Sequence, residues 1–273
     1  MISFSVLMSV YRNDKADCVR TAVESVTIRQ TLQPAEVILM VDGPVSVDLK
    51  QTINELEKQI CYLKPVWLKE NVGLGNILRI GMEYCTNELV ARMDADDISL
   101  PDRFEKQIEY MFSHPELAVV GGQISEFIDT PTNIVSYRRV PCNSTECRRY
   151  YANRDPLNHM SVCLRRSAVL DVGSYQPWHL DEDTFLWGRL LLKGYEVGNL
   201  PDILVNVRVG AQMYARRGGY NYFKSDMGIL QWKYKNGLMS LLQYYYNYVV
   251  RFMVYVMMPN KLRGCFFRLF MRK

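Results

Sequence analysis

Several common signatures are missing from this chain of 273 residues. Its seven cysteines include no Cys-x-x-Cys pair, which excludes the usual spacing of a zinc site, and their odd number favours a reducing cytosol. No internal repeat or low-complexity linker occurs. The first apolar run has no basic leader before it, so we interpret it as a buried strand and not as a signal peptide.

Acidic residues are missing from the last part of the chain. No Asp or Glu follows Asp226, whereas eight Lys and Arg residues do, so the net charge of +4 divides into +8 for this segment and −4 for the rest. Residues 238–258 are apolar, but Gln243, Asn247, Arg251 and five tyrosines interrupt them. This segment is therefore a poor membrane-spanning helix.

Apolar runs alternate with segments of helical periodicity through the first hundred residues. The pattern predicts strands at 4–11, 36–41, 66–68 and 88–93, and helices at 16–30, 47–59 and 73–84. Such alternation indicates an α/β fold whose parallel sheet is covered by helices on both faces. Ligands of such sheets bind beyond the carboxyl ends of the strands, where Tyr11, Asp42 and Asp94 are expected.

The rest of the chain completes one domain and a tail. The pattern predicts further helices at 101–112 and 182–193 and strands at 118–122 and 134–140. We place the domain at 1–219. Residues 220–273 form a basic, aromatic-rich, amphipathic helical tail.

The acidic run Asp94-Ala95-Asp96-Asp97 follows a predicted buried strand. Three acids so close resist joint ionisation unless a cation neutralises them. Their hard oxygen atoms suit Mg²⁺ or Mn²⁺ bridging a diphosphate. The alternative is an acidic turn that caps the following helix.

Five motifs occur in an order that resembles one known family. They are SVLMSVY at 5–11, VDG at 41–43, ENVGL at 70–74, DADD at 94–97 and ED-x-x-LW at 182–187. In this order they resemble the family 2 glycosyltransferases, especially the bacterial enzymes of O-antigen and capsule synthesis. The resemblance spans about residues 3–210 and implies the GT-A fold, a Rossmann-like, mixed and mostly parallel sheet flanked by helices. It implies that the domain at 1–219 is catalytic, with a donor-binding half at about 1–100 and an acceptor half at about 101–219.

The resemblance implies roles for residues of the first half. Ser9 and Tyr11 would border the nucleotide base, and Asp42 would accept a hydrogen bond from a uracil nitrogen, which favours a UDP-sugar donor. Otherwise Tyr11 is a packed strand residue and Asp42 caps a turn. Relatives often have Asp-Asp-Gly where this chain has Val-Asp-Gly at 41–43, and Asn where Arg79 stands. Arg79 would reach a donor phosphate or lie on a solvated helix face.

The resemblance also assigns the acidic run and its supporting residues. Asp96 would be the principal ligand of Mn²⁺ or Mg²⁺, Asp94 would contact the metal and the ribose, and Asp97 would support them. Arg208 and Arg217 could hold the pyrophosphate, although solvated basic residues are the default interpretation.

Asp183 matches the family position that removes the proton from the acceptor hydroxyl. It opens a predicted helix, whose dipole favours an ionised carboxylate, and Glu182 precedes it. The alternative is that these acids are plain helix caps. His159 matches a histidine near the acceptor cleft of O-antigen enzymes, although a lone histidine is usually structural.

The tail mixes bulky apolar and basic side chains, as in a helix that lies on an anionic membrane. No RNA-recognition module is present, so we expect no nucleic-acid partner. The alternative for residues 244–256 is a helix that packs back on the catalytic domain.

Together these features predict an inverting enzyme that moves a hexose or N-acetylhexosamine, with galactose or glucose as the best choice, from a UDP-sugar to a saccharide on undecaprenyl diphosphate. It would be peripheral to the cytoplasmic face of the bacterial inner membrane. A nucleotidyltransferase is one alternative, but the loop at 11–14 after the first strand has no glycine. A noncatalytic membrane-associated scaffold is the other.

Overall fold

A computed structural model describes residues 2–210 and 219–259. Its strands are β1 (Phe4–Val10), β2 (Glu36–Val41), β3 (Leu63–Trp67), β4 (Leu89–Asp94), β5 (Ile98–Ser99), β6 (Leu117–Phe127), β7 (Ile134–Arg138), β8 (Cys163–Arg165) and β9 (Glu196–Arg208). Its α-helices are α1 (Ala16–Ser25), α2 (Val47–Gln59), α3 (Leu74–Tyr84), α4 (Arg103–Ser113), α5 (Ser144–Tyr151), α6 (Arg166–Asp171), α7 (Glu182–Leu192), α9 (Tyr220–Lys235) and α10 (Leu241–Phe252). A 3₁₀ turn (His159–Ser161) precedes β8, and a π-helical turn (Met253–Met257) continues α10.

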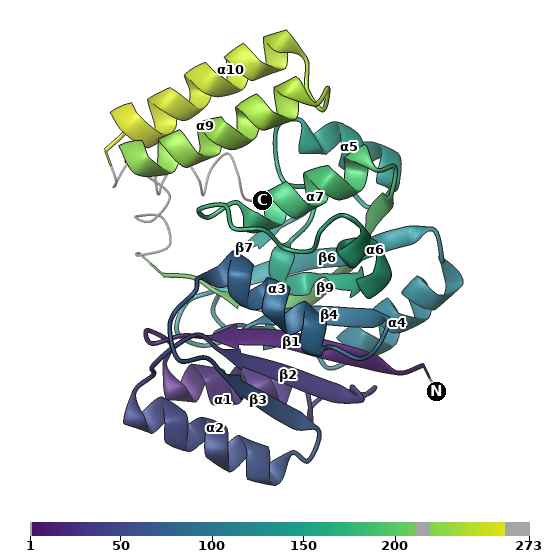
Figure 1. Ribbon diagram of the computed structural model, residues 1–273, viewed down its shortest axis with the longest axis vertical. Coiled ribbons are helices and arrows are strands. Elements are labelled where there is room, and N and C mark those ends of the chain that lie inside the picture. Colours follow the sequence, from purple (N-terminus) through teal and green to yellow (C-terminus); the bar gives the residue numbers. More distant parts are fainter. Residues whose placement is uncertain (1, 211–218, 260–273) are drawn as a thin grey trace.

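One mixed sheet runs through the molecule in the order β3-β2-β1-β4-β8-β6-β9-β5, with β7 paired to β6 (Figure 1). The first four strands are parallel, and most paired residues of the whole sheet lie in parallel pairs. The carboxyl ends of β1, β2 and β4 therefore meet at one edge of the molecule.

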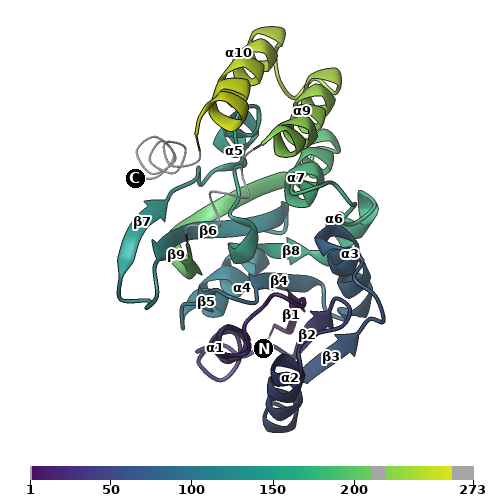
Figure 2. The same cartoon turned by 90° about the vertical axis from the view of Figure 1, so that its left-hand side faces the viewer.

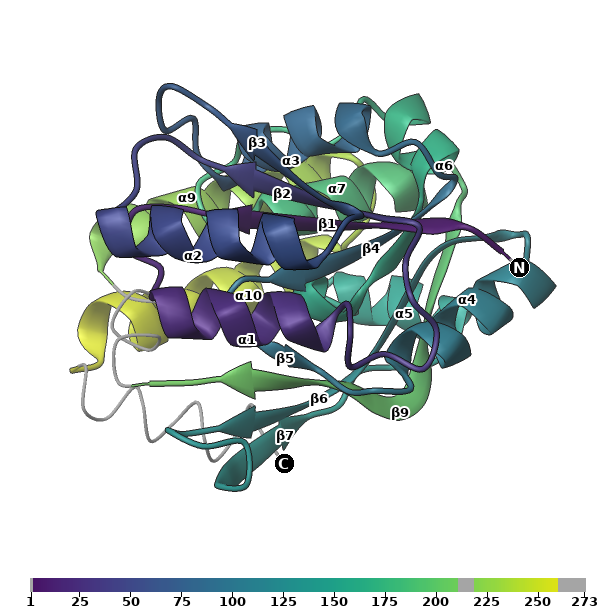
Figure 3. The same ribbon diagram turned by 90° about the horizontal axis from the view of Figure 1, so that it is seen from below.

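Helices cover both faces of the sheet. Apolar side chains of α1, α2 and α4, among them Val19, Leu49 and Phe104, form one core with the face that carries Met8. Figure 3 shows α1 and α2 side by side over that face. Side chains of α3 and α7 form the second core on the opposite face. The expected α/β fold with helices on both faces is thus confirmed.

Most predicted elements occur, with shifted ends. The helix from 47 and the strand from 36 have the expected bounds, whereas β3 begins at Leu63, three residues before the predicted strand. The helix predicted to run to residue 30 ends at Ser25. Here the hydroxyl groups of Ser25 and Thr27 donate hydrogen bonds to carbonyls of the preceding turn, which competes with regular helix.

Two strands, the short β5 and the long β9, were not predicted. The longest, β9, is paired along its length with β6, yet polar and charged residues such as Asn199, Asp202 and Asn206 interrupt its sequence. Its pairing is therefore visible only in the tertiary structure.

The segment that begins at Tyr220 packs back on the domain. Helix α9 lies between α7 and α10, which is outermost (Figures 1 and 2). Charged and polar side chains make this contact: Lys233 Nζ donates to the carbonyl of Tyr151 at 2.9 Å, and Asn247 donates to the side chain of Asn153 at 2.8 Å. The alternative prediction, a helix at 244–256 that packs back on the domain, therefore agrees with the structure.

A buried ion pair joins α10 to α9. Arg251 bonds Asp226, whose side chain is 5% exposed and whose second oxygen has no hydrogen-bond partner in the described part of the chain. The carboxylates of Asp155 and Asp181 face the same region. We expect Arg251→Met to lower the free energy of unfolding by about 3–5 kcal/mol in chemical denaturation, because it leaves an uncompensated buried carboxylate.

The matched control is Lys193→Met, which breaks the exposed pair between Lys193 and Asp171. It should leave the denaturation midpoint unchanged. A similarly small effect of Arg251→Met would show that the buried pair does not hold the two helices.

Candidate active site at the carboxyl ends of the parallel strands

Strand register brings the predicted residues to one place. Ser9 of β1 lies opposite Asp94 of β4 on one side and Met40 of β2 on the other. Side chains alternate along a strand, so all three point to the face that α3 and α7 cover. Tyr11 and Asp42 directly follow β1 and β2 at the same edge. The expectation that these strand ends converge is confirmed.

Asp42 fastens the loop that enters α3. Its carboxylate accepts hydrogen bonds from the backbone N–H of Val72 at 2.7 Å, from that of Gly73 at 3.1 Å and from the side chain of Asn71 at 2.9 Å. Gly43 must lack a side chain, because a Cβ atom there would lie 2.6 Å from the nitrogen of Asn71. A carboxylate has about four acceptor positions, so these three hydrogen bonds leave about one position of Asp42 unused.

The acidic run separates into accessible and buried members. Asp94 and Asp96 reach solvent, with the side chain of Asp94 31% exposed, whereas Asp97 is buried. Asp97 accepts a hydrogen bond from the backbone of Arg208 at 2.8 Å, and burial together with the charges of Asp94 and Asp96 holds its pKa well above the ordinary value. Asp97 therefore anchors the turn, and the other two are available to a ligand.

Arg208 holds the same turn from the end of β9. Its guanidinium donates to the carbonyls of Asp96 at 3.2 Å and Asp129 at 3.0 Å and lies 4.7 Å from the ring centre of Phe127. This arrangement gives Arg208 a supporting role for the acidic turn. Its expected contact with pyrophosphate remains a prediction.

The donor set at this edge fits a divalent cation held partly by a ligand. Two accessible carboxylates, Asp94 and Asp96, are hard oxygen donors, and partial desolvation and the charge of Asp94 raise the pKa of Asp96, which a cation would reverse. Among residues 2–210 and 219–259, no three His, Cys, Asp or Glu side chains are grouped to hold a metal by themselves. Further ligands would have to come from a bound diphosphate or from water.

Sequence reasoning missed Arg92, which lies beneath the acidic run. This β4 residue is 2% exposed, and its Nη2 pairs with Asp94 Oδ1 at 2.5 Å. Its Nε and Nη1 have no hydrogen-bond partner in the described ranges. Burial alone would lower the pKa of Arg92, but the charges of Asp94, Tyr175 and Asp183 and the hydrogen bond to Asp94 together raise it above its ordinary value, so Arg92 stays a cation. A charged residue inside an otherwise apolar predicted strand was the available signal.

Asp183 begins α7 close to this cation. Its Oδ1 accepts from the backbone N–H of Thr184 at 2.8 Å, and its Oδ2 lies 3.8 Å from His159 Nδ1. Burial and the charges of Asp155 and Glu182 raise the pKa of Asp183 to about 7, against the opposing charge of Arg92. A carboxylate with this pKa can accept a proton near neutral pH.

His159 is part of the wall behind Asp183. It is buried, and its Nε2 shares a hydrogen bond of 3.0 Å with the hydroxyl of Tyr175. Burial and the charge of Arg92 hold the pKa of His159 well below its ordinary value. The ring is therefore neutral at physiological pH. Glu182 is buried beside Asp183, and burial raises its pKa as well.

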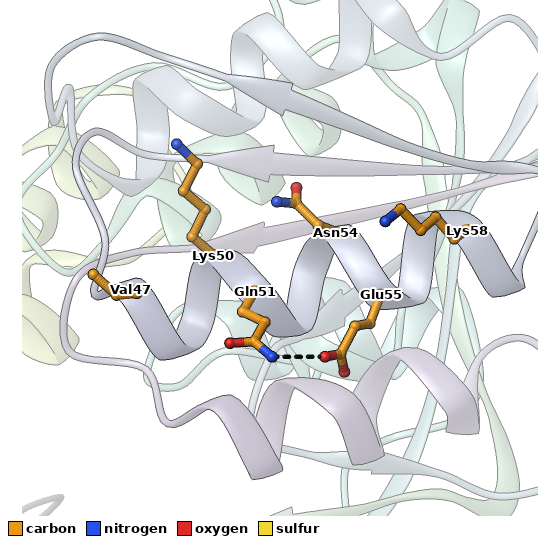
Figure 4. A pocket seen from close by; sticks show the side chains of 6 residues that line it. All are labelled: Val47, Lys50, Gln51, Asn54, Glu55 and Lys58. Atoms are coloured by element: carbon orange, nitrogen blue, oxygen red, sulfur yellow. Dashed lines mark hydrogen bonds between the residues drawn. The ribbon is translucent and has the colours of Figure 1, made fainter.

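The remaining candidates are less well placed. Arg79 is exposed on α3, and Arg217 lies outside the described residues. Figure 4 shows a shallow depression along the outer surface of α2, lined by Val47, Lys50, Gln51, Asn54, Glu55 and Lys58. None of the predicted site residues lines it, so the depression is separate from the candidate site.

Comparison with known proteins agrees with this geometry. Residues 5–173 match the family described as Glycosyl transferase family 2. The chain is 41% identical to the amylovoran biosynthesis glycosyltransferase AmsE of Erwinia amylovora over 84% of this chain and 85% of that protein. It is 30% identical to an Escherichia coli enzyme named UDP-Gal:alpha-D-GlcNAc-diphosphoundecaprenol beta-1,3-galactosyltransferase, over 99% and 97% of the two chains.

Solved structures with this fold include S. aureus TarS. A TarS structure superposes with a TM-score of 0.65 at 16% identity over 98% of this chain, which spans 46% of the TarS chain. A shorter TarS chain, crystallised in complex with UDP-GlcNAc, superposes with a TM-score of 0.64 at 18% identity over 98% of this chain and 76% of that one. At such identities the likeness concerns the fold.

This chain belongs to glycosyl transferase family 2. It is an enzyme that transfers glycosyl groups, and its mixed α/β fold is of the GT-A type. Enzymes of this family typically use a divalent metal, and the two accessible acids at 94 and 96 are compatible with one.

The electrostatic reach of Arg92 can be measured without any substrate. Arg92→Gln should raise the pKa of His159 by about one pH unit in an NMR titration, because the repulsion between two cations disappears. Arg92→Lys keeps the charge and should keep the pKa of His159 low.

The other two histidines, His114 and His179, serve as internal references in the same spectra. An unchanged His159 in the Gln variant would show that burial alone keeps the ring neutral.

Proposed function

We propose that this enzyme moves a hexose or N-acetylhexosamine, best galactose or glucose, from a UDP-sugar to a saccharide on undecaprenyl diphosphate, with inversion at the sugar carbon. The observation that carries the proposal is the combination of a carboxylate with a pKa of about 7 at Asp183 and accessible acids at the strand ends. The name of the E. coli relative and the UDP-GlcNAc complex of TarS support the donor and acceptor classes.

The donor would lie across the carboxyl ends of β1, β2 and β4. Ser9 and Tyr11 would border the base, and the remaining acceptor position of Asp42 would receive the uracil N–H. Arg79 is proposed for a phosphate. Asp94 and Asp96 would hold Mn²⁺ or Mg²⁺, which when bound supplies charge to stabilise the leaving diphosphate.

Asp183 would act on the acceptor. Its Oδ2 takes the proton from the attacking hydroxyl while that oxygen bonds to the anomeric carbon and UDP leaves from the opposite face. A neutral His159 beside Oδ2 does not compete for this proton, because its own pKa is held low. An α-linked donor would thus give a β-linked product.

An acceptor on a lipid places the enzyme at a membrane surface. No helix among residues 2–210 and 219–259 is both long and apolar enough to cross a bilayer. We therefore propose peripheral attachment at the cytoplasmic face of the inner membrane, in which basic residues after Asp226 other than the inward-pointing Lys233 and Arg251, such as the exposed Lys235, are attracted to anionic lipids. The names of two relatives, the amylovoran biosynthesis enzyme and an E. coli O-antigen biosynthesis glycosyltransferase 27% identical to this chain, support O-antigen or capsule synthesis as the pathway.

The test is an assay against a panel of UDP- and GDP-sugars with a lipid diphosphate acceptor. Wild-type kcat/KM should rise as pH increases through about 7, because Asp183 accepts a proton only when ionised. Asp183→Asn should reduce kcat/KM by about 10²–10⁴ and leave UDP binding unchanged.

Asp181→Asn is the matched control. Burial and the charge of Asp226 hold the pKa of Asp181 well above its ordinary value, so its neutral form already resembles asparagine. This variant should keep most of its activity. Release of pyrophosphate in place of UDP would indicate a nucleotidyltransferase, and absence of any turnover with intact UDP binding would indicate a scaffold.

Metal dependence gives an independent prediction. A chelator should abolish transfer, and Mn²⁺ or Mg²⁺ should restore it. Asp96→Asn should raise the metal concentration needed for half-maximal activity at least about tenfold, since an accessible ligand is lost. Calorimetry of Mn²⁺ binding with UDP present should show the same weakening.

Asp102→Asn, which alters an exposed acid on the adjoining turn, should leave the metal requirement unchanged. Full activity of wild-type enzyme in the chelator would contradict the assignment of Asp94 and Asp96.

A further inference from the structure

Helix α10 directs its strongly polar residues inward and leaves a row of apolar residues exposed, unlike an ordinary surface helix. Its one charged residue, Arg251, points inward to Asp226, and Asn247 is buried against Asn153. A helix on the surface of a soluble domain normally directs apolar residues to the core and charged residues to water.

The outward side of α10 and of the π-helical turn that follows it is a continuous apolar stripe. At helical spacing it consists of Leu242, Tyr245, Tyr246, Val249, Met253 and Met257. Leu242 is 83% exposed, Tyr246 is 67% exposed and Met257 is 61% exposed. No charged residue lies among these positions. A contiguous apolar patch of this kind usually marks an interaction surface.

We propose that this stripe docks onto an anionic lipid bilayer. Leucine, valine and methionine supply apolar area, and tyrosine rings with a polar hydroxyl favour the boundary between acyl chains and headgroups. The chain carries only cations after Asp226, among them the exposed Lys235, which complements an anionic surface. The proposal rests on the proposed function in one respect: the lipid-linked acceptor would lie in the membrane to which the stripe binds.

A second copy of the chain fits the stripe less well. A symmetric dimer through α10 would bring two strongly basic C-terminal segments together, and like charges oppose such an approach. An anionic bilayer meets the same charges with attraction. We therefore commit to the bilayer, with the dimer as an outcome of the test.

The inner side of α10 ties this docking surface to the candidate base. Arg251 also donates to the carbonyl of Asn153 at 3.0 Å, close to the end of α5. Helix α9 reaches α7 through Trp232, whose ring centre lies 5.0 Å from that of Phe185, two residues after Asp183. The bilayer contact would thus fix the height of the site above the membrane.

The test is sedimentation of the full chain with unilamellar vesicles. Wild-type protein should bind vesicles of phosphatidylglycerol mixed equally with phosphatidylcholine about tenfold or more tightly than pure phosphatidylcholine, and added salt should weaken this binding. The double variant Leu242→Glu with Val249→Glu should bind the anionic vesicles at least about tenfold more weakly, because two apolar contacts are lost.

The double variant Ile28→Glu with Phe112→Glu is the matched control, since it places the same two charges at exposed apolar positions away from the stripe, 60% exposed after α1 and 70% exposed on α4. It should bind vesicles like the wild type. Circular dichroism should show the stripe variant folded, because both of its sites point to solvent. Undiminished vesicle binding by the stripe variant would overturn the proposal. A wild-type protein that binds neither the anionic nor the phosphatidylcholine vesicles would also overturn it.

Light scattering addresses the second copy. The proposal expects a monomer in both wild type and stripe variant. A wild-type dimer that the stripe variant dissociates would assign the stripe to a second copy and overturn the bilayer. The binding assay contains no donor sugar, so it can succeed even if the proposed donor or acceptor is wrong. A stripe variant that transfers sugar normally to a soluble acceptor but poorly to an acceptor embedded in vesicles would agree with both the bilayer contact and the proposed function.

Discussion

A single buried cation organises the candidate site. Arg92 lies under the end of β4, pairs with Asp94 and faces Asp183 and His159 from within the domain. A guanidinium removed from water needs negative charge nearby, and a group of carboxylates needs positive charge. The guanidinium and the carboxylates therefore stabilise each other. The acids can lie close together at the strand ends because a cation, and not only bound protons, balances their charge.

The same principle governs the C-terminal hairpin. Arg251 and Lys233 are buried where the carboxylates of Asp226, Asp181 and Asp155 face one another. These cations belong to helices α9 and α10, which the sequence analysis assigned to a tail separate from the catalytic domain. Their contacts join the hairpin to the elements around α7, while the outward side of α10 is left apolar. Charge on the inside and apolar residues on the outside make this helix a structural part of the enzyme and a candidate contact with lipid.

Local patterns in the chain were sufficient for the first half of the fold. The strands β1, β2 and β4 and the helices between them follow from apolar runs and periodicity. The strands are buried along nearly their whole length, and the helices bury apolar residues at helical spacing. Strand β9 does not, because asparagine and aspartate interrupt its apolar positions, and it is defined by its pairing with β6 and β5. Arg92 was hidden for a related reason: a charge within an apolar run shows its importance only once its burial is known.

By itself, the sequence determined which residue types stand at which strand ends, and hence the family and the candidate acids, since motif order and strand alternation are local properties. Tertiary structure alone decided how these residues differ. It buried Asp97 and left Asp96 accessible, raised the pKa of Asp183 to about 7 and kept His159 neutral. It also turned the polar side of α10 inward. Burial and the distances between charges set these properties, and both depend on segments that are far apart in the chain.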